Sequence, residues 1–245
     1  MSSIQFHIRR FYALSPGLVE QDEWLAWHKN SGQWPSEFSA LPADKIPAMM
    51  RRRMSKLSKI AVQVAAELSE GEDIGYTVFS SRHGELERTV QLLQDILSGE
   101  DASPTAFSQS VHNTAAGLFT IATKKAIPAS SIAAGEDGFH YALLEAFLFL
   151  NEQPDKKVLI VDFDAPLPDV YSRFEPHTTA PYALGLVIEA GDAVTLARTA
   201  PESKTRHDKT LPQALSFYRH WLNGDRQFSM QSQRQQWHWE LEAIC

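Results

Sequence analysis

A short apolar strand leads directly into a helix in the stretch GYTVFSSRHGELERTVQLLQDIL, residues 75–97. The run at 75–80 predicts a short buried strand. Four apolar residues then share one side of a helix predicted over 85–97, namely Val90, Leu93, Ile96 and Leu97. Gly99 follows and is expected to end this helix. A strand followed at once by a helix is a building unit of layered α/β folds, so this stretch indicates that fold class.

Outward from this stretch, strands and helices continue to alternate. Other strands are predicted over 4–14, 129–134, 158–162, 183–189 and 193–197, with a turn at Gly191-Asp192 between the last two. Helices are predicted over 48–70, 115–122, 136–150 and 211–222, with an aromatic helix or turn over 23–28. Loops are predicted over 31–47 and 103–113, and the Gln- and Trp-rich C-terminus receives no assignment. This order predicts one α/β domain over 1–245, with a mixed, mostly parallel sheet, helices on both faces and an extra C-terminal helix.

The composition is that of an ordinary globular protein, with 43% hydrophobic and 22% charged residues among 245. A net charge of −7 argues against a general nucleic-acid binder. With one cysteine, Cys245, the chain forms no internal disulfide. Residues 1–20 do not have the pattern of a secretory signal, and no run approaches the ~20 apolar residues of a membrane helix. We therefore expect a cytoplasmic protein with no integral membrane segment.

Three segments together resemble a known family. They are RRRMSKLSK at 51–59, TVFSSRHGE at 77–85 with its continuation SPTAFSQSVHNTAAG at 103–117, and AAGEDGF at 133–139. In this order they resemble the N-terminal half of a β-ketoacyl synthase of the thiolase superfamily, over about residues 45–190. The second segment is the most specific of the three. The resemblance implies a single thiolase-like half domain, with the C-terminal thiolase half absent.

The resemblance also implies that the catalytic residues are missing. Active ketosynthases carry a nucleophilic cysteine at a strand-to-helix turn, where the helix N-terminus stabilises a thiolate. That position falls on Glu136 here, and the neighbours Gly135 and Asp137 are not thiols either. The family's two catalytic histidines lie in its second half, one in a His-Gly-Thr-Gly-Thr motif, whereas the only His-Gly here is His83-Gly84. This pattern is similar to that of a chain-length factor, the non-catalytic partner of a ketosynthase in bacterial aryl-polyene and related type II polyketide pathways.

A chain-length factor implies partners and surfaces. The main partner would be an active β-ketoacyl synthase, in a heterodimer or heterotetramer, and the substrate would arrive on an acyl carrier protein. In ketosynthases the 103–113 loop approaches the dimer partner and the acyl tunnel, so five residues are candidates for the tunnel and interface: Phe107, Ser108, Val111, His112 and Asn113. A basic cluster is the candidate carrier-protein docking site: Arg51, Arg52, Arg53 and Lys56, with Lys59 nearby. A solvated helix face would explain the same charges.

The same sequence also suggests other chemistry. Glu136 and Asp137 form a candidate acid–base pair, although two acids that begin a helix also complement its dipole. Ser110, His112 and Asn113 suggest a hydrolase, but no Gly-x-Ser-x-Gly turn accompanies them, and a loop packed in an interface is the simpler interpretation. An independent acyl-processing enzyme, a hydrolase or a decarboxylase, therefore stays an alternative function. A scaffold that only stabilises or recruits the synthase is the other alternative.

Patterns that suggest a metal are weak in this sequence. Asp162-Phe163-Asp164 matches an Asp-x-Asp pair at the end of a strand, but it lacks further ligands. His220, His238 and Cys245 fit no zinc spacing. Trp221, Trp237 and Trp239 are expected to pack against the domain or a partner. We therefore expect no metal and no cofactor of the chain's own.

Overall fold

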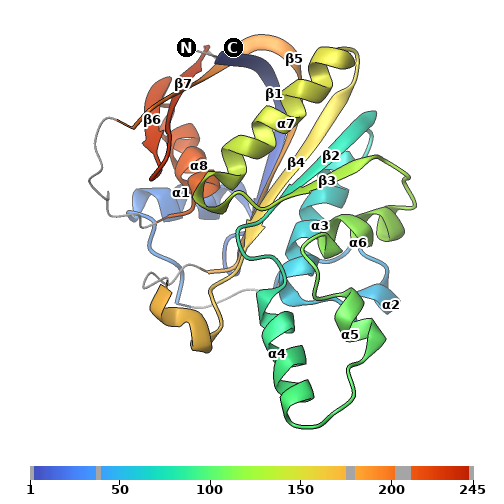
Figure 1. Ribbon diagram of the computed structural model, residues 1–245. Coiled ribbons are helices and arrows are strands. Elements are labelled where there is room, and N and C mark those ends of the chain that lie inside the picture. Colours follow the sequence, from blue (N-terminus) through green and yellow to red (C-terminus); the bar gives the residue numbers. More distant parts are fainter. Residues whose placement is uncertain (1–2, 37–39, 175–179, 202–210, 243–245) are drawn as a thin grey trace.

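The computed structural model describes residues 3–36, 40–174, 180–201 and 211–242. A seven-stranded sheet lies at its centre in the order β3-β2-β4-β5-β7-β6, with β1 also paired to β5 (Figure 1). The strands are β1 (Ser3–Leu14), β2 (Ile74–Ser80), β3 (Ala129–Ile132), β4 (Lys157–Asp164), β5 (Tyr182–Thr199), β6 (Gln227–Gln231) and β7 (Gln236–Leu241). The helices are α1 (Gln21–Lys29), α2 (Ala48–Arg51), α3 (Lys56–Ser69), α4 (Leu86–Leu97), α5 (Pro104–Ser108), α6 (Thr114–Thr123), α7 (Gly138–Glu152) and α8 (Gln213–Asn223), with 3₁₀ turns η1 (Gly135–Asp137) and η2 (Asp169–Phe174). The mixed α/β class predicted from the sequence is confirmed.

Parallel pairing is confined to one part of this mixed sheet. β2 runs parallel to β3 and to β4, with Thr77 opposite Ala129 on one side and Leu159 on the other. The other four pairings, β1 with β5, β4 with β5, β5 with β7 and β6 with β7, are antiparallel. The parallel share of this mixed sheet is smaller than the sequence predicted, because β5 runs antiparallel to both β1 and β4 and the C-terminal hairpin adds two more antiparallel pairings.

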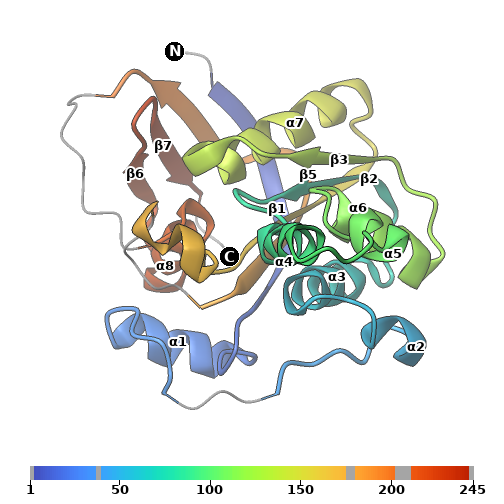
Figure 2. The same cartoon turned by 60° about the horizontal axis from the view of Figure 1, so that its bottom comes forward.

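Helices cover both faces of the sheet, as predicted. Figure 2 shows α7 on one side of the strands and α3 on the other. Buried residues of α7 and α8 pack with both tryptophans of β7 in one core cluster, whereas α3 and α6 pack with the opposite side chains of β4 and β5 in a second. β4 is buried along six consecutive residues, Val158–Phe163, because both of its faces are covered.

The helix predicted over 48–70 is broken at residues 52–55. The side chain of Ser55 accepts a hydrogen bond from the Ser58 backbone N–H at 2.8 Å, which caps the start of α3. A residue that caps a new helix has extended backbone angles and cannot continue the previous one. The apolar stripe of the prediction is confirmed over α3, where Leu57, Ala61 and Leu68 are all buried.

The strands predicted over 183–189 and 193–197 form one long strand, β5, and this corrects the predicted turn at Gly191-Asp192. Pairing with β1 skips from Glu189 to Val194, so these two residues lie in a bulge of β5 rather than in a hairpin. A Cβ atom on Gly191 would lie 2.9 Å from the Cβ of His7. Glycine at this position therefore allows β1 and β5 to approach each other closely at the bulge.

The predicted C-terminal helix is confirmed as α8, and the unassigned segment after it forms the β6–β7 hairpin. This hairpin adds to the sheet through β7 and β5. Trp237 and Trp239 of β7 are buried, and Trp239 packs on Phe217 of α8 and on Phe139 of α7. Trp221 contacts Phe11 and Phe217, so all three tryptophans pack within the domain.

α4 and α5 project from the rest of the molecule (Figure 1), and we call residues 86–108 the α4–α5 arm. The helix predicted over 85–97 is confirmed, but Leu92 is its only buried residue. Leu93, Ile96 and Leu97 are 50%, 46% and 86% exposed. The apolar side of α4 therefore faces outward. Within the described residues, no helix has the length and hydropathy to cross a membrane.

Candidate functional site

The turn that begins α7 is where the family resemblance places a nucleophile. β3 is followed by Gly135, whose φ of +61° is a left-handed angle that glycine adopts freely, and then by the 3₁₀ turn η1. Glu136 is half-buried, and its Oε2 accepts from the backbone N–H of Gln233 at 3.4 Å. Neither Gly135, Glu136 nor Asp137 offers a thiol, so the turn has the geometry of a helix N-terminus without a nucleophilic sulfur.

Asp137 is buried and acts as an acceptor for three side chains. Its Oδ1 accepts from Trp237 Nε1 at 2.8 Å and from Gln213 Nε2 at 3.1 Å, and its Oδ2 accepts from the Ser232 hydroxyl at 2.8 Å. The donors come from α8, from β7 and from the turn between β6 and β7. Asp137 therefore joins the start of α7 to the C-terminal segment. Because all three bonds are internal to the fold, the acid–base interpretation of Glu136 and Asp137 gains no support.

His140, one turn further along α7, extends the same network. Its Nε2 accepts from Trp239 Nε1 at 3.0 Å, so Nδ1 carries the proton and donates to Gln213 Oε1. The ring stacks on Trp237 with centroids 4.5 Å apart. Burial lowers the pKa of His140 to about 4, so the ring is neutral at neutral pH. This histidine was not singled out from the sequence.

The acids at the end of β4 are held within the fold. Asp164 accepts from the backbone N–H groups of Arg82 and His83 and from the Ser81 hydroxyl, which shapes the turn between β2 and α4. Asp162 accepts from the Tyr182 hydroxyl at 2.7 Å. Within the residues described, no group of three or more His, Cys, Asp or Glu side chains is placed to hold a metal. The Asp-x-Asp pattern is thus accounted for by local structure, and Cys245 of the other pattern lies outside the described residues.

Burial raises the pKa of Asp162 to about 7, and the nearby charge of Asp164 acts in the same direction. The folded chain thus holds this proton more tightly than the unfolded chain does, and folding stability falls as pH rises from about 4 to about 7. Asp162→Asn keeps the shape of the protonated acid without the titration. We expect the variant to match the parent near pH 4 and to exceed it at pH 8 by up to about 4 kcal/mol, in urea unfolding.

The pH dependence of the parent alone would not test this expectation. The lowered pKa of His140 has the opposite effect, because its contribution to stability is lost as pH falls from about 6.5 toward about 4. That contribution is common to parent and variant and cancels in their difference. A difference between Asp162→Asn and the parent that stays constant from pH 4 to pH 8 would contradict the expectation.

The predicted tunnel residues lie on α5 and on the turn that follows it. Phe107 is 62% and Val111 37% exposed, and Ser108 and Asn113 are exposed as well. His112 is half-buried instead, because its Nε2 bonds the Ser81 carbonyl oxygen at 2.8 Å and its ring contacts the Gly84 position. The structure therefore puts four of these residues on an accessible surface and gives His112 a part in holding the loop.

A hydrolase site is not assembled at this loop. The Ser110 hydroxyl donates to the Phe107 carbonyl oxygen at 2.9 Å, and the Ser108 hydroxyl donates to the Thr105 carbonyl oxygen at 3.0 Å. His112 points to Ser81 instead of to either serine. A nucleophilic serine requires a base within hydrogen-bonding reach, and the contacts of these three residues do not supply one.

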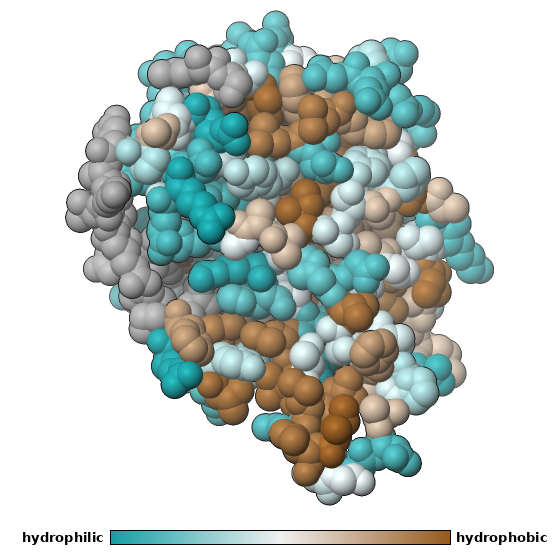
Figure 3. All heavy atoms as spheres, viewed as in Figure 1, coloured by the Kyte–Doolittle hydropathy of each residue, from teal (hydrophilic) through white to brown (hydrophobic). Residues whose placement is uncertain are grey.

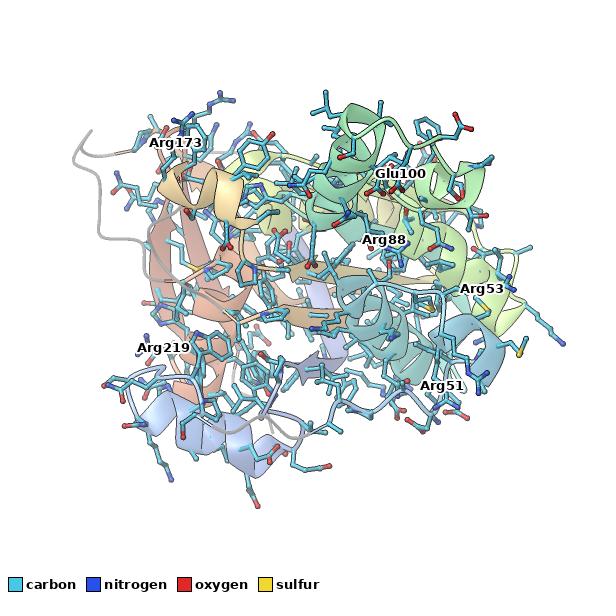
Figure 4. All side chains as sticks on the ribbon, turned by 90° about the horizontal axis from the view of Figure 1, so that it is seen from below. Arg51, Arg53, Arg88, Glu100, Arg173 and Arg219 are labelled. Atoms are coloured by element: carbon cyan, nitrogen blue, oxygen red, sulfur yellow. The ribbon has the colours of Figure 1, made fainter. Side chains whose placement is uncertain are left out.

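The predicted docking cluster spans the break between α2 and α3. Arg51 ends α2 and Lys56 begins α3, with Arg52 and Arg53 in the turn between them. Arg52, Arg53 and Lys56 are exposed, whereas Arg51 and Lys59 are half-buried. Figure 4 shows Arg51 and Arg53 along one edge of the molecule, with Arg88 of α4 further in from that edge. The cluster is thus a cationic edge next to the α4–α5 arm.

A sheet with α7 on one face and α3 and α6 on the other is the architecture of a thiolase-like ketosynthase half domain. The family model described as "Beta-ketoacyl synthase, N-terminal domain" matches residues 24–240. The chain therefore belongs to the β-ketoacyl synthase family, through its N-terminal domain. Among curated proteins, none matches this chain.

Solved structures give the same assignment. One chain in the structure of the ketosynthase ApeO in complex with its chain length factor ApeC, from Xenorhabdus doucetiae, is 33% identical to this chain with a TM-score of 0.86. The match covers 97% of this chain and 99% of that chain, so the two have nearly the same length. The ishigamide ketosynthase/chain length factor has 14% identity and a TM-score of 0.61, over 82% of this chain and 68% of its own. A β-ketoacyl synthase from Burkholderia phymatum STM815 has 14% identity and a TM-score of 0.58, over 82% of this chain and 66% of its own. At these lower identities the last two show the fold alone.

Proposed function

We propose that this chain is the non-catalytic, chain-length-factor-like partner subunit of a β-ketoacyl synthase, in an aryl-polyene or related type II polyketide pathway. The observation that carries the proposal is the turn at Gly135, Glu136 and Asp137, which begins α7 where the family resemblance places the nucleophile and which has no thiol. Asp137 is committed to hydrogen bonds inside the fold, and Glu136 lies against Gln233. A subunit of this kind depends on its partner for the cysteine and both histidines.

Exposed apolar side chains support a permanent partner. They gather on α4, at Leu93, Ile96 and Leu97, and continue to Phe107 on α5, while Leu148 of α7 is 60% exposed. Figure 3 shows apolar surface over the arm at the bottom of the view and over α7 at the top. Monomeric proteins rarely expose large apolar patches without a binding role. A helix of twelve residues with one buried side chain is also too short to be stable without further packing.

The same surface provides the role in chain length. Phe107 and Val111 are apolar and accessible, and Ser108 and Asn113 lie beside them. Placed against the partner, these side chains would close the far end of an acyl tunnel and limit the growing chain by steric contact. Arg52, Arg53 and Lys56 would receive an acidic acyl carrier protein at the neighbouring edge. The relative of nearly equal length belongs to a complex of a ketosynthase with its chain length factor, which supports a partner role of this kind.

The test is co-expression with a β-ketoacyl synthase that has an intact cysteine and is encoded beside this chain. We expect a stable 1:1 or 2:2 complex by size-exclusion chromatography with mass determination, and elongation of an acyl chain on its carrier protein. The chain alone is expected to be inactive. A monomer that does not bind the synthase would overturn the proposal. Activity of the isolated chain that is lost in Glu136→Gln would support an independent enzyme.

A further inference from the structure

The α4–α5 arm is attached to the domain mainly through polar contacts. α5 has no buried residue, and α4 has only Leu92. We call residues 103–113, which hold α5 and the turn after it, the Phe107 loop. Its position depends on the hydrogen bonds that link the arm to its surroundings. Two residues of α4 make these links, Arg88 and Thr89, and of the two only Arg88 also reaches the turn between α2 and α3.

Arg88 bridges the arm and the basic cluster. Its Nη1 donates to the Gln109 side-chain Oε1 at 2.6 Å, and its Nη2 donates to the Arg53 carbonyl oxygen at 2.8 Å. One guanidinium group thus joins the residue that follows α5 to the turn between α2 and α3. The planar guanidinium presents several N–H groups in fixed directions, so both bonds form at once and set the distance between the two segments.

Glu85 fixes Arg88 from the other side. The Glu85 carboxylate is buried, lies 3.7 Å from Arg88 Nε, and accepts from the hydroxyls of Ser55 and Ser58. Ser55 is itself the cap of α3. The contacts therefore run from the capped start of α3, through Glu85 and Arg88, to Gln109 beside the Phe107 loop. The Arg88 side chain is 27% exposed, so it is partly shielded from water.

We propose that Arg88 is a positioning residue. It holds the chain-length surface of Phe107 and Val111 at a fixed distance and orientation from the carrier-docking edge at Arg53. This inference rests on the proposed function and deepens it, because it assigns the relative placement of the two surfaces to one side chain. Arg88 touches no substrate in this role. It acts through Gln109 on the loop and through the Arg53 carbonyl on the edge.

Loss of Arg88 should loosen the arm without unfolding the domain. The Thr89 hydroxyl lies 3.1 Å from the Ser110 carbonyl oxygen and remains a second link to the loop. In Arg88→Gln, we expect the ketosynthase complex to keep its mass while the product distribution broadens. The share of the main chain length should fall about twofold or more, because a small misplacement of a positioning element has a large effect. Arg88→Lys should broaden the product distribution too, since an ammonium group cannot make the same two directed hydrogen bonds to Gln109 and to the Arg53 carbonyl oxygen.

Variants of Gln109 separate positioning from a general structural effect. Gln109→Ala removes one of the two acceptors of Arg88 and should also broaden the distribution, and Arg88→Gln with Gln109→Ala should be no broader than Arg88→Gln alone. Gln109→Glu keeps an acceptor for the guanidinium and should retain the parent distribution. Arg173→Gln, an exposed arginine on η2 that contacts Phe174, is the matched control and should also retain it.

The outcomes distinguish this inference from the proposed function. If the parent chain forms no elongating complex, the proposed function fails and the inference fails with it. If the parent complex makes a narrow distribution and Arg88→Gln leaves it unchanged, only the positioning role of Arg88 is overturned. A narrow parent distribution that broadens in Arg88→Gln and Gln109→Ala, but not in Gln109→Glu, supports it.

Discussion

Asp137→Ala is expected to lower the free energy of unfolding by about 3–5 kcal/mol, the largest effect on stability that we predict for a single substitution. The change leaves Trp237 Nε1, Gln213 Nε2 and the Ser232 hydroxyl without their shared acceptor. A buried donor without an acceptor costs about 1–3 kcal/mol. Ser232 keeps a second acceptor in the Gln235 carbonyl oxygen at 3.3 Å, so the sum stays below three full penalties.

Urea unfolding followed by tryptophan fluorescence measures this effect directly, because Trp237 and Trp239 are buried in the affected region. Asp137→Asn is the graded control, since its amide oxygen can still accept from Gln213 and Trp237, and it should lose about 1 kcal/mol. Glu136→Ala is the neighbouring control and should stay within about 0.5 kcal/mol of the parent. Equal stability of Asp137→Ala and Glu136→Ala would show that the network does not anchor the C-terminal segment.

Phe107→Ala is expected to lengthen the products of the ketosynthase complex by at least one two-carbon unit. Phe107 is the largest side chain on the exposed loop, and its removal would open space at the end of the proposed tunnel. Val111→Ala removes less volume and should give a smaller shift in the same direction. Mass spectrometry of the chains bound to the carrier protein, at matched complex concentration, gives the length distribution.

Leu97→Ala is the matched control for this prediction. Leu97 is also apolar and is 86% exposed, but it lies at the end of α4 and is not one of the predicted tunnel residues. Its truncation should weaken the complex without changing product length. If Phe107→Ala reduces the yield and leaves the length distribution as it was, the chain acts as a scaffold and not as a length-setting subunit.

Most secondary structure could be predicted because it depends on neighbouring residues. The unbroken apolar run of β4 and the stripe along α3 both reflect burial that a short window of sequence displays. The break at Ser55 was missed because a helix cap depends on backbone geometry that propensity does not encode. The bulge at Gly191 was missed because its register is set by pairing with β1, at the other end of the sequence. The sequence signal for the break was Ser55 itself, because serine is a preferred helix-capping residue, but it lies within a longer apolar pattern.

The sequence by itself determined the α/β class, the family resemblance and the absence of a thiol near Glu136, since all three are properties of order and residue type. Only the tertiary structure decided what Asp137 and the apolar side of α4 do. The partners of Asp137 are 76, 95 and 100 residues away, and no local pattern connects them. An amphipathic stripe shows that a face must be covered, but the packing of the whole chain determines whether the chain itself covers that face or leaves it exposed.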